Sequence, residues 1–219
     1  MSIKPVLFNT KMVRAILEGR KSCTRRIVKP QQLIGMLPDK CKNGAPEKFL
    51  KEKKLMFKPY CDMTDIELIN TAYKAPYQPG DILYVRETWK KAPNGYYYYE
   101  DWQRNDIADV TKWKPSIRMP KEAARIWLKV TNVRVERLQE ITDEQAKREG
   151  IQYDECPTGF TWKQETDMHN CYTTPIGAMQ ALWNSTIKKS DLDGYGWDAN
   201  PWVWTIEFER CEKPEEISG

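Results

Sequence analysis

The chain has few of the residues from which metal sites and disulfide frameworks are built. It contains one histidine, His169, and six cysteines, and no two of these cysteines form a Cys-x-x-Cys pair. The only sulfur near His169 in the sequence is that of Cys171. Zinc sites usually need tighter clusters of ligands, so we expect no bound metal.

Long apolar runs, phosphate-binding glycine loops and internal repeats are also missing. No stretch approaches the roughly 20 apolar residues of a membrane helix. Residues 1–10 carry one lysine and no long apolar run, which argues against a secretory signal. Neither a Gly-x-Gly-x-x-Gly pattern nor a P-loop occurs, and we expect no cofactor. These absences predict a cytoplasmic protein with reduced cysteines and no membrane contact.

What the chain has is an uneven distribution of charge. Its 219 residues are 40% hydrophobic and 30% charged, which suffices for a buried core, and the net charge is +4. Residues 1–60 hold 15 Lys and Arg against 4 Asp and Glu, whereas the remainder holds 20 against 27. This asymmetry favours a basic face that binds nucleic acid or a nucleotide. The alternative is uneven surface charge without a function.

Hydrophobic spacing and turn residues predict a mixed α+β fold. We expect helices over 11–18, 141–150 and 175–187. Asn9 or Thr10 caps the first, Thr142 caps the second in a capping box with Gln145, and Gly19 and Gly150 end them. Strands are expected over 82–89 and 202–208, a strand pair over 124–135, and a hairpin at Asn94-Gly95.

These elements suit a small curved sheet or β-barrel flanked by helices. Residues 1–212 form a single domain in this interpretation, with insertions at about 31–77, 93–118 and 152–175. The first insertion is polar and lysine-rich, and a helix is expected near 47–54. Residues 213–219 are expected to be a disordered tail.

The most basic segment, residues 20–26, follows the first helix and is expected to form a loop or a sheet edge. The cationic side chains of Arg20, Lys21, Arg25 and Arg26 suit the binding of phosphate groups. The hydroxyl of Thr24 can donate a hydrogen bond to phosphate or act as a nucleophile. A solvated basic turn is the alternative interpretation.

Several segments together resemble the ASCH domain family. They are Gly-Arg-Lys-Ser-Cys-Thr-Arg-Arg at 19–26, Pro-Gly-Asp-Ile-Leu-Tyr-Val-Arg-Glu at 79–87, Ile-Thr-Asp-Glu-Gln-Ala-Lys-Arg-Glu-Gly at 141–150 and Trp-Val-Trp-Thr-Ile-Glu-Phe at 202–208. The resemblance implies a PUA-like fold, a small β-barrel flanked by helices, with a basic cleft for RNA or a nucleoside. Some compact bacterial members hydrolyse the amide of N4-acetylcytidine, and other members are reported as ribonucleases.

The resemblance also implies site residues. The lysine, threonine and glutamate of those amidohydrolases fall on Lys21, Thr24 and Glu149, and a following arginine falls on Arg26. In such a reaction the Thr24 hydroxyl attacks the amide carbonyl and Lys21 takes its proton. Arg26 stabilises the developing negative charge, and Glu149 passes a proton to the leaving amine. A binding module without catalysis and a ribonuclease that uses the same cleft remain alternatives.

Glu87 and Trp89 complete the predicted binding residues. The carboxylate of Glu87 can accept a hydrogen bond from the amino edge of a base, or it can pair with Arg86 or an arginine of the cleft. The ring of Trp89 can stack on an unpaired base, or it can pack in the protein interior. The partners expected from these residues are RNA, another single-stranded nucleic acid or a modified nucleoside.

Overall fold

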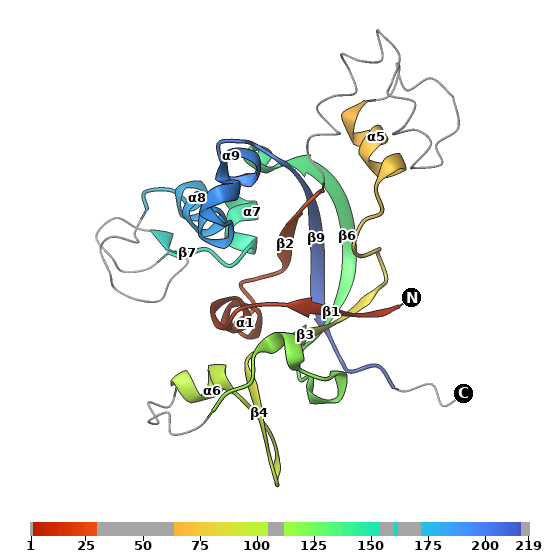
Figure 1. Ribbon diagram of the computed structural model, residues 1–219, viewed down its shortest axis with the longest axis vertical. Helices are drawn as coiled ribbons and strands as arrows, with labels where there is room; N and C mark the ends of the chain where they lie inside the picture. The colour runs from red at the N-terminus through yellow and green to blue at the C-terminus, as the bar shows by residue number, and fades with distance from the viewer. Residues whose placement is uncertain (1, 30–63, 105–111, 154–159, 162–171, 216–219) are drawn as a thin grey trace.

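The computed structural model describes residues 2–29, 64–104, 112–153, 160–161 and 172–215 (Figure 1). Its centre is a curved five-stranded sheet with the strand order β1-β3-β6-β9-β2. The strands are β1 (Ile3–Leu7), β2 (Cys23–Ile27), β3 (Ile82–Arg86), β6 (Trp127–Arg137) and β9 (Trp202–Cys211). Strand β1 pairs parallel with β3, and the other neighbours are antiparallel. Helices accompany the sheet, so the mixed α+β prediction is confirmed.

The predicted barrel is not closed within the part of the chain that the structure describes. Strands β1 and β2 are the two edges of the sheet and do not pair with each other. The side chain of Arg26 crosses from one edge to the other, because its Nη2 donates a hydrogen bond to the backbone oxygen of Leu7 at 3.1 Å. The sheet therefore curls until its edges approach, and it leaves a seam between them.

The segment predicted as a strand pair over 124–135 is one long strand, β6, and the prediction was wrong. A β-bulge between Val130 and Asn132 shifts the register against β9. Such a bulge changes the phase of the side-chain alternation within one strand. The apolar alternation in the sequence therefore changes phase between Val130 and Val133, and this is the pattern expected where one strand ends and another begins.

Local capping signals place the two helices that border the site. In α1 (Thr10–Leu17), the Asn9 side chain accepts a hydrogen bond from the backbone nitrogen of Met12, and Gly19 follows with φ +77°. In α7 (Asp143–Arg148), Thr142 and Gln145 form the predicted capping box. Both helices follow the sequence-based prediction because caps and glycine stops act within one turn of the chain.

The remaining elements surround the sheet. A hairpin of β4 (Trp89–Ala92) and β5 (Gly95–Tyr98) projects from one end, as the Asn94-Gly95 signal predicts. Strand β3 ends earlier than predicted, because Trp89 already begins this hairpin.

The other helices that the structure describes are α5 (Asp65–Ala72), α6 (Tyr99–Arg104), α8 (Pro175–Thr186) and α9 (Leu192–Tyr195). Short strands β7 (Gln152–Tyr153) and β8 (Phe160–Thr161) pair with each other. Single 3₁₀ turns are η2 (Ser116–Arg118), η3 (Lys121–Ala123), η4 (Leu138–Glu140) and η6 (Lys189–Asp191).

Hydrophobic clusters lie on both sides of the sheet. One contains Val13 and Ile16 of α1 together with Trp204, Ile206 and Phe208 of β9. A second packs α7 and α8 around Val203 of β9. Ile69 of α5 and Tyr73 belong to the first cluster, so the described end of the segment predicted as an insertion over 31–77 contributes to the core. The helix expected near 47–54 lies outside the described residues.

Candidate functional site

The loop between α1 and β2 runs beside the C-terminal end of α7. The backbone nitrogens of Arg20 and Lys21 both donate to the oxygen of Ala15, which turns the chain after the helix. Lys21 then forms an isolated antiparallel bridge with Glu149. Gly150 permits this approach, because a Cβ added there would lie 3.0 Å from the Cβ of Ala15, and its φ of +105° disfavours other residues.

The bridge brings two of the predicted catalytic side chains into contact. Lys21 Nζ donates to Glu149 Oε2 at 2.6 Å and to the backbone oxygen of Glu149 at 2.9 Å. The side chains are 0% and 4% exposed, so this ion pair lies in the interior of the protein. The other carboxylate oxygen, Oε1, accepts a hydrogen bond from Arg25 Nη1 at 3.2 Å. Two buried cations therefore hold Glu149 through both of its oxygens.

Arg25 continues this contact into a buried network of charges. Its Nε and Nη2 bind Glu136 Oε1 at 3.0 and 2.6 Å, and Nη2 also binds Gln145. Burial raises the pKa of Glu136, but a hydrogen bond from Thr205 and the charges of Arg25 and Arg134 outweigh it and hold the pKa below its ordinary value. The side chain of Arg25, expected to bind phosphate, is 0% exposed and binds protein carboxylates.

Strand alternation separates the residues of β2 into two groups. Arg25 pairs with Thr205 and lies on the side of the sheet that carries the charged network. Thr24 pairs with Ile206, and Arg26 pairs with Trp204, so their side chains lie on the opposite side, which carries the first hydrophobic cluster. Thr24 is buried there, on the other face of the strand from the Arg25–Glu149 contact.

The ring of Phe8 lies close to both Lys21 and Arg26, which stand near the two ends of the basic segment 20–26. The Lys21 ammonium is 5.5 Å from the centre of the Phe8 ring, and the Arg26 guanidinium carbon is 5.7 Å from it. The structure therefore gathers Lys21, Glu149 and Arg25 through ion pairs, and Lys21 and Arg26 around one aromatic ring.

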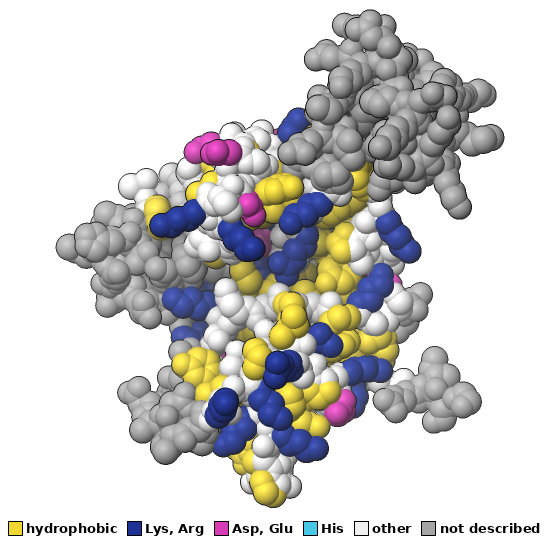
Figure 2. Space-filling view, viewed as in Figure 1, with side chains coloured by type: hydrophobic (Ala, Val, Ile, Leu, Met, Phe, Trp, Pro, Cys, Tyr) yellow, Lys and Arg dark blue, Asp and Glu magenta, His cyan; other side chains and the backbone are white. Residues whose placement is uncertain are grey.

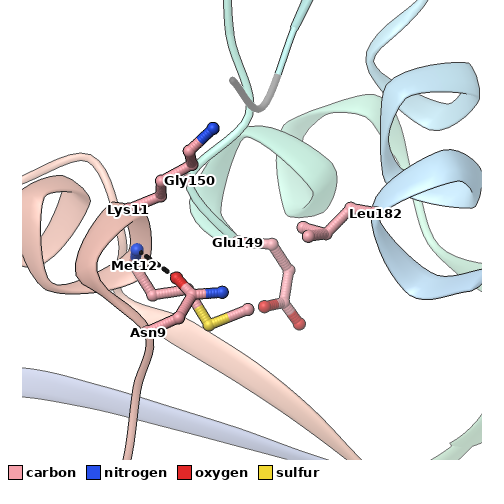
Figure 3. A pocket seen from close by; sticks show the side chains of 6 residues that line it. All are labelled: Asn9, Lys11, Met12, Glu149, Gly150 and Leu182. Carbon is pink, nitrogen blue, oxygen red and sulfur yellow. Dashed lines mark hydrogen bonds between the residues drawn. The ribbon is translucent and has the colours of Figure 1, made fainter. Parts of the chain in front are cut away.

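A small pocket opens between α1 and α7 next to this ion pair. Figure 3 shows the carboxylate of Glu149 between the side chains of Met12 and Leu182, with Asn9 close to Met12. The cavity volume is about 20 Å³. That volume holds about one water molecule, whereas pockets for small-molecule ligands have volumes of about 300–1,000 Å³.

A larger groove follows the seam between the sheet edges. On one side lie the end of β2 and Lys29, on the other lies the segment from Tyr73 to Tyr77, and Trp204 contributes from β9. The volume is about 500 Å³. The groove is lined by Arg26, Ile27, Val28, Lys29, Tyr73, Lys74, Pro76, Tyr77 and Trp204. Three of these residues are cationic and none is acidic. We call it the seam groove.

An adjoining hollow of about 450 Å³ shares Tyr73, Lys74 and Trp204 with the seam groove. Hydrogen bonds hold one wall of the seam groove in place, because the Tyr77 hydroxyl donates to the backbone oxygen of Pro5 at 2.9 Å. The Lys4 ammonium likewise donates to the backbone oxygen of Pro76 at 3.3 Å. The segment from Tyr73 to Tyr77 is thereby attached to the edge strand β1.

The other predicted binding residues lie within protein contacts. Arg20 binds Glu18 and the backbone oxygen of Gly150. Glu87 is buried and forms a bidentate ion pair with Arg125, with both contacts at 2.9 Å. The sequence analysis offered Arg86 or an arginine of the cleft as the partner of Glu87, and the partner in the structure is Arg125.

Trp89 is 5% exposed, and its ring centre lies 5.7 Å from that of Tyr96. In this structure the ring packs within the protein, as one of its two sequence interpretations expects. The seam groove was missed by sequence reasoning. Its cations Lys29 and Lys74 stand 45 positions apart in the sequence, and no local motif joins them.

Within the described residues, no group of three or more His, Cys, Asp and Glu side chains is arranged to hold a metal ion. The described helices are all too short or too polar to cross a bilayer.

Comparisons with known proteins leave the family open. No family model matches the chain, and no curated protein matches it. A crystal structure of an ASCH domain from Lactobacillus crispatus JV V101 is similar to it at 11% sequence identity, with a TM-score of 0.39. The match covers 95% of this chain and 79% of that one. A similarity at this level assigns neither a family nor an activity to this chain.

Proposed function

We propose that this protein binds single-stranded nucleic acid, and that the seam groove holds a nucleotide of that strand. The observation that carries the proposal is the composition of the groove, in which cations and aromatic rings line one hollow with no acidic side chain among the described lining residues. Cations bind the phosphates, and an aromatic or apolar wall accommodates the base. The volume of about 500 Å³ lies in the range of ligand pockets.

The cations of the groove differ in how they are held. Lys29 and Lys74 are exposed, and the Lys29 ammonium lies 5.1 Å from the centre of the Tyr195 ring of α9. Arg26 is half-buried, and its hydrogen bond to Leu7 fixes the guanidinium across the seam. This arrangement supports one oriented phosphate contact from Arg26 and two further phosphate contacts from the exposed lysines.

The double variant Lys29→Ala/Lys74→Ala tests the groove. Binding of a labelled oligonucleotide of four residues is followed by fluorescence anisotropy at several salt concentrations. Each phosphate contact to a single strand contributes about 0.7 to the slope of log K against log salt. The double variant is therefore expected to lower the slope by about 1.4 and the affinity at 0.1 M salt by about 25-fold.

The matched control is Lys188→Ala/Lys189→Ala, which removes the same charge from exposed positions beside α8. Equal affinity losses in the two double variants would reject the groove as the binding site. Oligoribonucleotides and oligodeoxyribonucleotides are measured in parallel, so that a preference for RNA or DNA is read from the same titration.

A second candidate function is hydrolysis of the amide of an N4-acylated cytidine. The contact between Lys21 and Glu149 favours it, because the ammonium can pass a proton to a carboxylate 2.6 Å away and then act as a base. In this reaction Lys21 takes the proton of the Thr24 hydroxyl, and the oxygen bonds to the acetyl carbon. The step requires Thr24, which is buried on the opposite side of β2 from the Arg25–Glu149 contact, to be brought to the same substrate. The bond to the cytidine nitrogen breaks, Glu149 returns a proton to that nitrogen, and water then releases acetate from Thr24.

The small pocket sets a condition for this reaction. At about 20 Å³ it is far smaller than a nucleoside, so Met12 and Leu182 have to move apart before a substrate reaches Glu149. Incubation with N4-acetylcytidine, followed by absorbance, tests the activity. Turnover that is lost in Thr24→Ala supports hydrolysis, and no turnover at high enzyme concentration rejects it. Labelled single-stranded RNA in the same assay reports any ribonuclease activity.

A further inference from the structure

The β4–β5 hairpin carries a second concentration of cations, away from the seam groove. Lys90 and Lys91 lie on β4, and Lys114, Arg118 and Lys121 come from the segment that packs against the hairpin. We call these five residues the hairpin surface. Figure 2 shows Lys and Arg side chains gathered over the lower part of the visible face, with few Asp and Glu side chains among them. In the same view of Figure 1 the hairpin projects there.

Four side chains form the ordered centre of this surface. The Lys114 ammonium lies 5.0 Å from the centre of the Trp89 ring, and Trp89 packs against Tyr96 at 5.7 Å. The Lys91 ammonium lies 5.8 Å from the centre of the Tyr96 ring. Reciprocal backbone hydrogen bonds of 3.2 and 2.9 Å hold Lys114 next to Trp89. Two cations are thus positioned on a pair of packed aromatic rings.

The charges of the hairpin surface are not compensated within the described part of the chain. No described carboxylate forms an ion pair with any of its five cations, whereas cations of the body, such as Arg14, Arg25 and Arg125, bind carboxylates. Glu122 on η3 is exposed and reduces the net charge without cancelling it. Uncompensated positive charge on an ordered projecting element attracts a polyanion.

We propose that the hairpin surface binds the phosphate backbone of the same nucleic-acid strand whose nucleotide occupies the seam groove. This inference rests on the proposed function and extends it, because it gives the bound strand a second contact site outside the seam groove. The two cationic regions lie toward different ends of the molecule, since the hairpin and α5 project from opposite ends of its long axis in Figure 1. A short oligonucleotide reaches one region, and a longer strand reaches both.

The double variant Lys91→Ala/Lys114→Ala tests the hairpin surface, with Lys188→Ala/Lys189→Ala again as the control of equal charge. Affinities are measured for strands of about 4 and about 16 nucleotides, the range that small single-strand-binding folds cover. We expect the hairpin variant to lose about 25-fold in affinity for the longer strand at 0.1 M salt, with a slope reduced by about 1.4. Its affinity for the short strand is expected to stay that of the unaltered protein.

Each outcome separates this inference from the proposed function. If the groove variant loses affinity for both strands and the hairpin variant for neither, the groove stands and the hairpin proposal falls. If the hairpin variant loses only long-strand affinity while the groove variant changes nothing, the hairpin contact stands and the groove assignment falls. A last experiment measures whether the protein and the hairpin variant sediment with acidic lipid vesicles. Vesicle binding that the hairpin variant abolishes, with oligonucleotide affinity unchanged, would identify a lipid surface and overturn the proposal.

Discussion

Replacing Glu149 with glutamine removes one negative charge from between two buried cations. Arg25 keeps Glu136 and Gln145 as partners, but Lys21 keeps only the backbone oxygen of residue 149 at 2.9 Å. An uncompensated ammonium then remains at 0% exposure. Removal of one partner of a buried ion pair costs about 3–5 kcal/mol, and we take the lower end, about 3 kcal/mol, because glutamine keeps an acceptor oxygen.

At this chain length each kcal/mol shifts the unfolding midpoint by about 2–4 °C, so Glu149→Gln is expected to lower it by about 6–12 °C. The double variant Lys21→Met/Glu149→Gln removes the buried ammonium as well and should recover about 2 kcal/mol. Urea unfolding followed by tryptophan fluorescence measures both. The single variant Lys21→Met is measured alongside them. A double variant destabilised by the sum of the Glu149→Gln and Lys21→Met effects would refute the reasoning, because the two side chains would then act independently.

Three other features have measurable consequences. Gly150→Ala should destabilise the protein by about 1–3 kcal/mol because of its positive φ and the contact with Ala15, whereas Gly194→Ala, with open space around its Cβ, should change stability by less than about 1 kcal/mol; equal effects in thermal unfolding would contradict this. Glu136 and Glu207 have pKa values held below the ordinary value of 4.5, since their hydrogen bonds and neighbouring arginines outweigh burial. The two carboxylates therefore stabilise the folded protein above about pH 4.5, and this contribution to the unfolding free energy is lost as the pH falls below that value. An unfolding free energy that stays constant from pH 5 to pH 3 would contradict this prediction. Burial raises the pKa of Cys23 to about 12, so iodoacetamide at pH 8 should label Cys211 well before Cys23, as read by peptide mass spectrometry.

The parts of the fold that the sequence predicts are those decided by neighbouring residues. Capping and glycine stops act within one helical turn, and they place α1 and α7 correctly. The alternation of β9 is likewise local. The bulge in β6 was missed, because it depends on the register against a strand some 70 positions away, which no local pattern contains.

The candidate site divides in the same way. The contact between Lys21 and Glu149 spans 128 positions, and the sequence gives it only through the resemblance to a family. The sequence predicts a single group of phosphate ligands in residues 20–26. Strand pairing instead sends Arg25 to the protein's own carboxylates and leaves Arg26 at the seam. Lys29 and Lys74 line the same groove because the segment from Tyr73 to Tyr77 is attached to β1, and this attachment is a property of the topology.

The alternation of β2 also fixes how this edge strand can be attached to its neighbour. A slip of one residue against β9 would exchange the two sides of β2, placing Arg25 at the seam and Arg26 among Glu136, Glu149 and Gln145. Hydrophobic contacts alone discriminate poorly between such alignments in a strand with only Ile27 as a large apolar residue. The buried carboxylates therefore fix the register of the outermost strand and keep Arg26 on the side of the sheet where it lines the seam groove.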